Sequence, residues 1–287
     1  MNTEDCRQMY ADGLRYAVNM RSDALWRAFA AVPREQFLGP GPWLTLGTVG
    51  AEQGYRRTPD DDPSHVYHDI LVALDPARRL NNGQPSWWAY WLDAVAPEPG
   101  DRVAHIGCAT GYYTAVLAEV VGPTGTLIGC ELDEGLCRAA AQNLRRWPQA
   151  TAVNADGVTF EPGQCSLIVV SAGVTRMPGQ WLKGLAPGGR LLVPLVARAP
   201  AVSQGRMLRV VKSEGGYGAS VLSYASFYPC VGTEHEASAQ RLFEALRKSA
   251  GFDVRSVRLD SHDPETTCWL HEEHYCLSTR DAPARHD

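Results

Sequence analysis

Hydrophobic residues in the middle of the chain come in short runs, and these runs alternate with stretches whose apolar positions recur at helical spacing. Strands that alternate with helices in this way indicate βαβ units with right-handed crossovers and a parallel sheet. The expected strands are 102–106, 126–131, 150–154, 166–172 and 189–195, and the expected helices are 111–121, 133–146 and 178–186.

The segments on either side of this region carry other patterns. Residues 1–38 have helical periodicity until Pro33, whereas 39–66 are rich in Gly, Pro, Asp and Arg and are expected as a long loop, which in compact domains is often a lid or a binding loop. A helix is expected after Pro85 in "SWWAYWLDAV". Further on, "MLRVVKS" and "ASVLSYASFY" flank "EGGYG" and predict a hairpin at the sheet edge, followed by a helix at 237–249 and late strands in "FDVRSVRL" and "CWLHEEHYCLS".

The charge and the cysteine pattern narrow the classes of function. The 287 residues carry a formal net charge of −5, and the basic clusters are pairs such as Arg56-Arg57, which disfavours a nucleic-acid binder. The 8 cysteines stand singly with no CxxC, so we expect buried, reduced thiols and no metal. No apolar stretch is long enough to span a bilayer and the N-terminus is polar and acidic, so a cytoplasmic location is expected.

The stretch "VAHIGCATGYYTAVLAEVVG", residues 103–122, joins the first strand of the alternating region to a helix through a glycine-rich turn. In doubly wound sheets, ligands bind at the carboxyl ends of the strands, where such a turn lies. Gly107 lets the backbone bend beside a ligand, and Gly111 lets the helix start near the strand. Cys108 and Ala109 stand where a GxGxxG motif makes room for a pyrophosphate, so the spacing suits a ligand with an adenosine and no pyrophosphate.

Acidic residues follow the next two strands. Glu131 ends the second strand, where a carboxylate accepts hydrogen bonds from ribose hydroxyls. Asp156, in "NADG" after the third strand, is expected beside an adenine edge. The glycine turn and the two acids, at successive strand ends, together predict S-adenosylmethionine (SAM) as the cofactor.

With these features the sequence resembles the protein-L-isoaspartate O-methyltransferase family of class I SAM-dependent methyltransferases. The resemblance covers about 31–232 and is carried, in family order, by "AVPREQFL", "NGQPSWWAYWLDAVAPEPGDRVAHIGCATGYYTAVLAEVVG", "CELDEGL", "ADG", "IVVSAGVTRMP", "LKGLAPGGRLLVPL" and "ASFYPCVG". It implies an α/β, Rossmann-like class I methyltransferase fold with a mostly parallel, doubly wound sheet and an antiparallel edge hairpin. The residues that it implies for the cofactor pocket are His105, Gly107, Cys108, Ala109, Thr110, Gly111, Tyr113, Glu131, Leu132, Asp156, Gly157 and Ser171, the last facing the methyl group.

Several positions depart from the family pattern. The family's Thr-Ile-Ser, which contacts the substrate carboxylate, falls on 81–83, where Asn-Asn-Gly removes both hydroxyls. The acid that usually stands two residues before the first glycine is His105, and the acid before the fourth strand is Ser166. Two interpretations of His105 stay open: a positional side chain that bonds the backbone or the methionine end of SAM, or a group in proton transfer or substrate contact.

A carboxylate is the acceptor that best fits these residues. It is already ionised at neutral pH and needs no general base, whereas a phenol or an amine asks for a base or a metal, for which the sequence shows no clear set. Amides bond a carboxylate without adding charge, so Asn82 and Gln84 join His105 and Ser171 as candidate catalytic residues, although "NNGQP" is also good turn chemistry. The side chains expected to contact the acceptor are Asn81, Asn82, Tyr55, Arg56, Arg57, His65, Tyr67 and His68.

We therefore predict a SAM-dependent O-methyltransferase that esterifies a carboxylate of a small acid or peptide, with no membrane or nucleic acid as partner. Its predicted parts are an N-terminal helical and loop cap (1–80), a SAM-binding domain (81–232) and an α+β C-terminal extension packed on the core (233–287). Three alternatives stay open: isoaspartyl repair of damaged proteins, methylation of an RNA or other nucleic-acid base, and a catalytically silent SAM-binding module.

Overall fold

The computed structural model describes residues 2–47, 51–198, 203–232 and 235–282. The chain forms two compact units that interleave along the sequence. Unit 1 comprises Met1–Asp101 and Cys108–Asn154, and unit 2 comprises Arg102–Gly107 and Ala155–Asp287. These boundaries cut through the predicted SAM-binding domain, so the division into cap, domain and extension stays a prediction.

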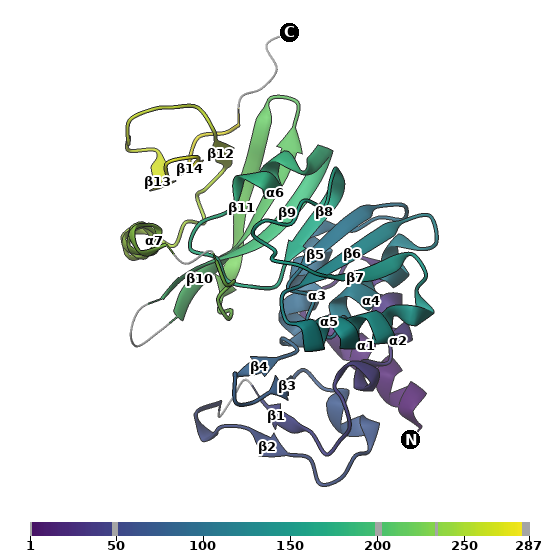
Figure 1. The fold of residues 1–287 in the computed structure, drawn as a ribbon. Helices are drawn as coiled ribbons and strands as arrows, with labels where there is room; N and C mark the ends of the chain where they lie inside the picture. Colours follow the sequence, from purple (N-terminus) through teal and green to yellow (C-terminus); the bar gives the residue numbers. More distant parts are fainter. Residues whose placement is uncertain (1, 48–50, 199–202, 233–234, 283–287) are drawn as a thin grey trace. The chain divides into compact units, whose positions relative to one another are not determined.

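Unit 1 contains the helices α1 to α5 (Figure 1). Helices α1, α2 and α3 contact one another, and α2 also packs against α4, a helix that is buried over almost its whole length. Side-chain caps begin three of the helices, because Asn2, Ser22 and Asp133 each accept a hydrogen bond from the backbone three residues on. The helices are α1 (Thr3–Ala17), α2 (Asp23–Ala31), α3 (Pro85–Val95), α4 (Tyr112–Val121) and α5 (Glu134–Asn143), and the 3₁₀ turns are η1 (Arg34–Phe37), η2 (Ala51–Gln53), η3 (Pro63–Val66) and η4 (Leu144–Arg146).

Unit 1 also contains a four-stranded antiparallel sheet in the order β2-β1-β3-β4, together with the parallel pair β6–β7. Part of this sheet lies within 39–66, where the sequence predicted a loop. Strands this short show no alternation that could reveal them, and they are stabilised by a buried cluster that includes Trp43 and Val72. The strands are β1 (Leu44–Leu46), β2 (Arg56–Arg57), β3 (Leu71–Asp75), β4 (Leu80–Asn81), β6 (Thr126–Glu131) and β7 (Ala150–Asn154).

Unit 2 contains the longer run of sheet. Strands β5, β8 and β9 are parallel, and from β9 onward neighbours pair antiparallel in the order β9-β10-β11-β12-β14-β13. Helix α7 contacts β9, β10 and β13. The elements are β5 (Arg102–Ile106), β8 (Cys165–Val170), α6 (Gly179–Lys183), β9 (Leu185–Arg198), β10 (Ser203–Ser213), β11 (Gly216–Ala225), α7 (Glu236–Lys248), β12 (Ser256–Arg258), β13 (Cys268–His271) and β14 (Cys276–Ser278).

Two predictions about this sheet need correction. The hairpin β10–β11 lies inside the run of strands instead of at its edge, because β12, β14 and β13 continue the sheet beyond β11. The helix expected at 178–186 ends at Lys183, since Leu185 already begins β9. The bounds of β5, β6 and β7, in contrast, are those that the sequence predicted.

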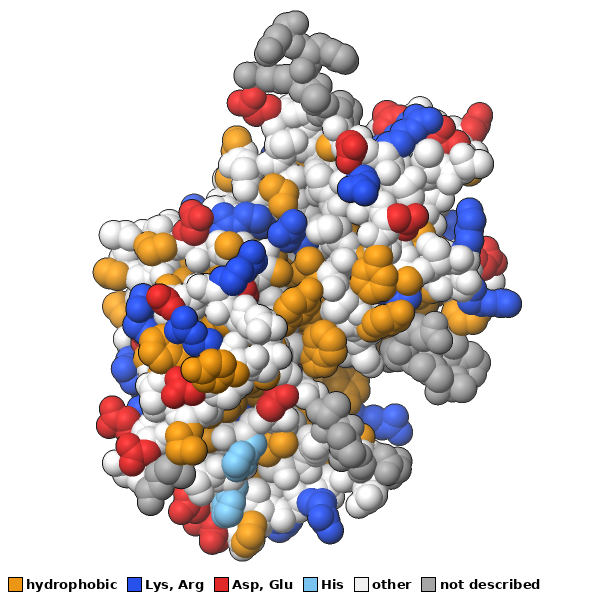
Figure 2. All heavy atoms as spheres, turned by 180° about the vertical axis from the view of Figure 1, so that it is seen from behind, with side chains coloured by type: hydrophobic (Ala, Val, Ile, Leu, Met, Phe, Trp, Pro, Cys, Tyr) orange, Lys and Arg blue, Asp and Glu red, His pale blue; other side chains and the backbone are white. Residues whose placement is uncertain are grey.

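The surface charges in Figure 2 are mixed in sign, and the cysteines are buried. On the face that Figure 2 draws, Lys and Arg side chains lie among Asp and Glu side chains, and no basic stripe crosses that face. All eight cysteines are buried and free, as predicted. Within the part of the chain that the structure describes, no helix has both the length and the apolar character needed to cross a bilayer.

Candidate functional site

Two candidate catalytic residues meet at the carboxyl ends of adjacent parallel strands in unit 2. His105 lies on β5 beside β8, and the backbone N–H of Ser171 donates to the carbonyl of Ile106 at 2.8 Å, which carries the pairing just past the end of β8. The imidazole Nε2 of His105 lies 2.6 Å from the hydroxyl oxygen of Ser171. The imidazole therefore fixes the direction of a hydroxyl at a position where parallel sheets bind ligands.

The imidazole of His105 is buried, with only 1% of the residue exposed. Burial lowers its pKa to about 3, because the charged form would lose its hydration. The ring is thus neutral at physiological pH. This favours the positional interpretation of His105, since a proton shuttle would have to charge the buried ring.

Gly157, next to Asp156, is packed against the end of β5 in the same unit. A Cβ at Gly157 would stand 2.4 Å from Cγ2 of Ile106, so only glycine fits there, and the indole of Trp181 donates to the Gly157 carbonyl at 3.0 Å. The carboxylate of Asp156 accepts from the backbone N–H of Val158 at 2.8 Å through one of its oxygens. These contacts fix the backbone around a half-buried acid, and the role of Asp156 beside an adenine edge stays a prediction.

The glycine turn of unit 1 is held by Glu131. Ala109 and Gly111 adopt positive φ angles of 49° and 92°, which let the turn between Cys108 and α4 close tightly. One carboxylate oxygen of Glu131 accepts from the N–H of Ala109 at 2.8 Å, and the other accepts from the N–H of Asp133 at 3.0 Å. Because each carboxylate oxygen accepts two bonds, Glu131 keeps acceptor capacity for a ribose while it orders the turn.

Two other predicted cofactor residues of unit 1, Thr110 and Tyr113, donate hydrogen bonds to backbone carbonyls. The hydroxyl of Thr110 donates to the carbonyl of Phe37 at 2.7 Å and is buried. The ring of Tyr113 stacks on Trp88 with centroids 4.7 Å apart, and its hydroxyl donates to the carbonyl of Gly83 at 3.2 Å. These two side chains therefore hold the backbone at Phe37 and Gly83 in place. Leu132, the residue after β6, is exposed.

The loop 81–84 combines turn chemistry with one unmatched donor. The amide oxygen of Asn81 accepts from the N–H of Gly83 at 2.9 Å, and the amide of Gln84 donates to Asp69 at 3.1 Å. The oxygen of buried Asn82 accepts from the N–H of Val72 at 3.1 Å, but its Nδ2 is buried with no hydrogen-bond partner. A carboxylate acceptor is a suitable partner for this donor.

Arg34 is a buried cation that the sequence analysis did not single out as a site residue. It is fully buried, and it donates to the carbonyls of Val66, His68 and Ile70 at 2.6–2.8 Å and to the oxygen of Asn82 at 3.3 Å. It thus adds positive charge beside Asn82. Arg34 belongs to the segment "AVPREQFL", one of those that carry the family resemblance, so this segment is the sequence signal that could have found it.

The loop residues expected over the acceptor differ in burial within unit 1. Tyr67 is buried and donates to the carboxylate of Glu35, and burial raises the pKa of its hydroxyl. It is a core residue and not a lid residue, because the ring of Tyr10 packs edge-on against it. The remaining members of the set are partly or fully exposed, and His65 pairs with Asp60 at 2.8 Å; these members are Tyr55, Arg56, Arg57, His65 and His68.

Comparison with known proteins finds methyltransferases. Residues 58–235, more than half of the chain, match the sequence profile of the family described as "Protein-L-isoaspartate(D-aspartate) O-methyltransferase (PCMT)". The protein-L-isoaspartate O-methyltransferase of Thermotoga maritima is 32% identical over 180 residues, which cover 61% of this chain and 51% of that protein. The chain therefore matches about half the length of this relative.

Solved structures agree on the fold. A protein-L-isoaspartate O-methyltransferase superposes with a TM-score of 0.66 at 26% identity, covering 84% of this chain and 69% of the other. A Plasmodium falciparum protein assigned to the same activity, in complex with S-adenosyl-L-homocysteine, gives a TM-score of 0.59 at 16% identity and covers 78% of this chain and 97% of its own. The predicted fold class, the Rossmann-like class I methyltransferase fold, is confirmed.

Proposed function

Because the chain belongs to the protein-L-isoaspartate O-methyltransferase family, we propose that it transfers the methyl group of SAM to the free carboxylate of an isoaspartyl residue in a peptide or protein. The match to residues 58–235 carries this proposal, since it includes the loop 81–84, the glycine turn and the end of β8. It favours the isoaspartyl alternative over the small acid that the sequence alone suggested.

Bound SAM supplies a methyl group activated by a sulfonium, so an ionised carboxylate accepts it without a base. The contribution of this chain is therefore alignment, which is able to supply roughly 7–11 kcal/mol of the barrier. In unit 1, Glu131 and the turn that it orders suit ribose hydroxyls. In unit 2, Gly157 lets the backbone pass close to Ile106, and the Ser171 hydroxyl, hydrogen-bonded to neutral His105, is a polar group of fixed position.

The loop 81–84 differs from the Thr-Ile-Ser of the family, and its neighbours suggest a replacement for the lost hydroxyls. Asn82 offers the unmatched N–H of its amide, and Arg34 adds a buried positive charge beside it. An amide donor next to a guanidinium suits a carboxylate, because both favour the ionised form of the acceptor. We infer that Asn82 is the residue of this loop that contacts the acceptor.

The test is methyl transfer from labelled SAM to two peptides that differ only in an isoaspartyl or an aspartyl linkage at one position. We expect label in the isoaspartyl peptide alone, released as methanol by mild alkali. Label in both peptides, or only in small acids of a cell extract, would contradict the isoaspartyl acceptor. Alkali-stable label would contradict a carboxylate acceptor altogether.

A further inference from the structure

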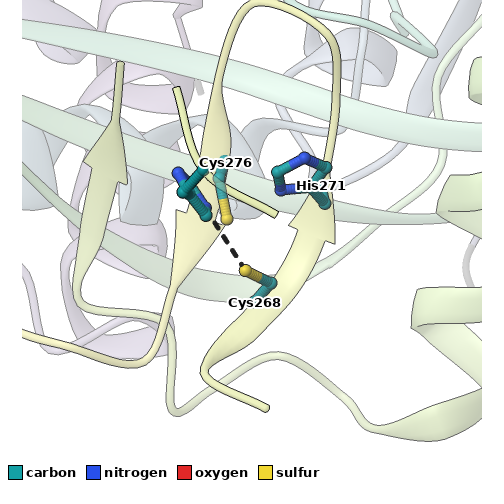
Figure 3. A group of neighbouring side chains, drawn as sticks. Cys268, His271 and Cys276 are labelled. Atoms are coloured by element: carbon teal, nitrogen blue, oxygen red, sulfur yellow. Dashed lines mark hydrogen bonds between the residues drawn. The ribbon is translucent and has the colours of Figure 1, made fainter. Parts of the chain in front are cut away.

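Four side chains of the C-terminal extension form a group that the methyl-transfer chemistry does not use. Cys268 and His271 lie on β13 and Cys276 lies on the neighbouring β14 (Figure 3). His262 comes from the segment between β12 and β13. Their ligand atoms, one from each side chain, all lie within 4.8 Å of one another. We propose that this group binds a Zn²⁺ ion as a structural Cys₂His₂ site.

The donor set and its spacing suit zinc. With Zn–S bonds of about 2.3 Å and Zn–N bonds of about 2.0–2.1 Å, the ligand atoms of a tetrahedral site stand about 3.3–3.8 Å apart. Small side-chain rotations bring atoms that already lie within 4.8 Å to this spacing. Two thiolates also neutralise the charge of the ion, which suits a site with two buried cysteines. Four protein ligands close the coordination sphere, so the site is structural and not catalytic.

His262 is already oriented as a metal ligand. Its Nδ1 lies 2.9 Å from the backbone carbonyl of Asp260, where only a protonated Nδ1 makes a hydrogen bond. The neutral ring therefore presents the lone pair of Nε2, which lies 3.4 Å from the sulfur of Cys268. A carbonyl that fixes the tautomer in this way is the usual outer contact of a metal-bound histidine. The N–H of Glu265 points at the same sulfur at 3.4 Å, an arrangement that stabilises a thiolate.

An unmatched atom in the group independently points to a ligand. Nδ1 of His271 is buried without a hydrogen-bond partner. Buried polar atoms are nearly always paired, so an imidazole in this state indicates that a partner belongs in the group. The ring of His271 stands edge-on to that of His262, with centroids 4.8 Å apart, so both imidazoles line the same space.

The segment that carries His262 is also preorganised. Residues 259–267 contain no helix or strand, but Arg258 pairs with Asp260 and Glu265, and Arg280 pairs with Glu265 at 3.1 Å. These ion pairs bring the two ends of the segment together without using any of the four ligands. The ion would then fasten the middle of the segment to the β13–β14 hairpin.

The spacing along the chain is H-x₅-C-x₂-H-x₄-C. The expectation of no metal depended on the absence of CxxC, which is only one of the spacings that zinc sites use. It missed a ligand set that alternates histidine and cysteine. This proposal replaces that expectation.

The first test is the metal content of the full-length protein, purified without chelator from cells grown with added zinc. We expect about one zinc per chain, and loss of that zinc in Cys268→Ser and in His271→Gln. The matched controls are His274→Gln, an exposed histidine in the same hairpin, and Cys137→Ser, a buried cysteine on α5; both should keep the ion.

The second test does not depend on the folding of variants. Chelator-treated wild-type protein is titrated with Co²⁺, and we expect the intense visible absorption of tetrahedral thiolate-bound cobalt, which equimolar Zn²⁺ removes. Any of three results would overturn the proposal: no uptake of either ion by reduced protein, a Cys268–Cys276 disulfide in the native protein by mass spectrometry, or undiminished zinc in both ligand variants.

Discussion

His105 shows how one buried residue links the site to the stability of the chain. Burial on β5 keeps its imidazole neutral, with a pKa of about 3, so it holds the Ser171 hydroxyl without adding charge. In the unfolded chain the same imidazole is protonated below about pH 6.5. The unfolded state therefore binds more protons between pH 6.5 and 3, and acid favours unfolding in this range.

The substitution His105→Gln removes the titratable imidazole and replaces it with an amide that is able to hydrogen-bond Ser171. We expect wild-type protein to lose about 2 kcal/mol more unfolding free energy than the variant between pH 7 and pH 5, measured by urea denaturation at both values. His274→Gln, at an exposed histidine, should behave as wild type. Equal losses in His105→Gln and wild type would mean that the imidazole titrates freely in the folded protein.

A substitution at Asn82 tests whether its unmatched amide N–H binds the acceptor. Asn82→Asp keeps the size and the acceptor toward Val72 but replaces the unmatched N–H with a second acceptor, beside Arg34. We expect the KM for an isoaspartyl peptide to rise at least about tenfold, equivalent to about 1.4 kcal/mol, with SAM affinity unchanged.

The control for this change is Asn81→Asp, because a carboxylate still accepts from the N–H of Gly83 and preserves the turn. Its KM should stay near that of the wild type. A similar rise in both variants would show that the loop responds to charge in general and not to the loss of the Asn82 donor.

At the scale of elements, helix α7 is joined to the end of β13 by one buried carboxylate. Glu272 accepts from the hydroxyl of Ser238 at 2.9 Å and from two nitrogens of Arg241 at 2.7 and 3.0 Å. Its side chain has no exposed area, whereas that of Arg241 is 41% exposed. Since the helix and the hairpin come from distant parts of the extension, this network is a main polar contact that fixes α7 on the sheet.

Glu272→Ala leaves the buried Ser238 hydroxyl without its acceptor, while the partly exposed Arg241 regains water. We expect a loss of about 1–3 kcal/mol in unfolding free energy, measured by urea denaturation. Glu273→Ala, whose side chain is 74% exposed, should change stability by less than about 0.5 kcal/mol. Equal effects of the two substitutions would refute a structural role for the Glu272 network.

At the scale of the molecule, the two ends of the sheet in unit 2 carry different candidate sites. His105 lies on β5 and Ser171 just past the end of the parallel strand β8, whereas β13 and β14, at the other end of the strand order, carry three of the four proposed zinc ligands. Four strands lie between β8 and β14 in the strand order: β9, β10, β11 and β12 pair in series before β14. Loss of the ion should therefore affect stability much more than methyl transfer.

Chelation tests this separation. An ion that binds only the folded state stabilises it by about 2.7 kcal/mol at 100 times its Kd, so we expect zinc removal to lower the Tm by about 5–10 °C. Isoaspartyl methylation at low temperature should change less than about twofold. His271→Gln should show the lowered Tm without chelator and His274→Gln should not. A chelator-independent Tm in the wild type would contradict the stabilising role of the ion.

Elements with local signals could be predicted from the residues alone. A short apolar run bounded by turn residues predicts a strand, and β5, β6 and β7 have the bounds that these runs predict. The glycine turn and Glu131 were also found, because positive φ angles and a strand-end acid leave their mark on a few consecutive residues. The same motifs carried the correct family and cofactor class.

Contacts between residues far apart along the chain could not be predicted, because they depend on how the elements pack. His105 and Ser171 are 66 positions apart, and Arg34 and Asn82 are 48 apart. The order of β12, β14 and β13, the burial of Tyr67 and the assembly of the His-Cys group likewise depend on packing between elements. Periodicity reports which face of an element is buried, but it carries no information about the partner that buries it, and that partner is set by the free energy of the whole fold.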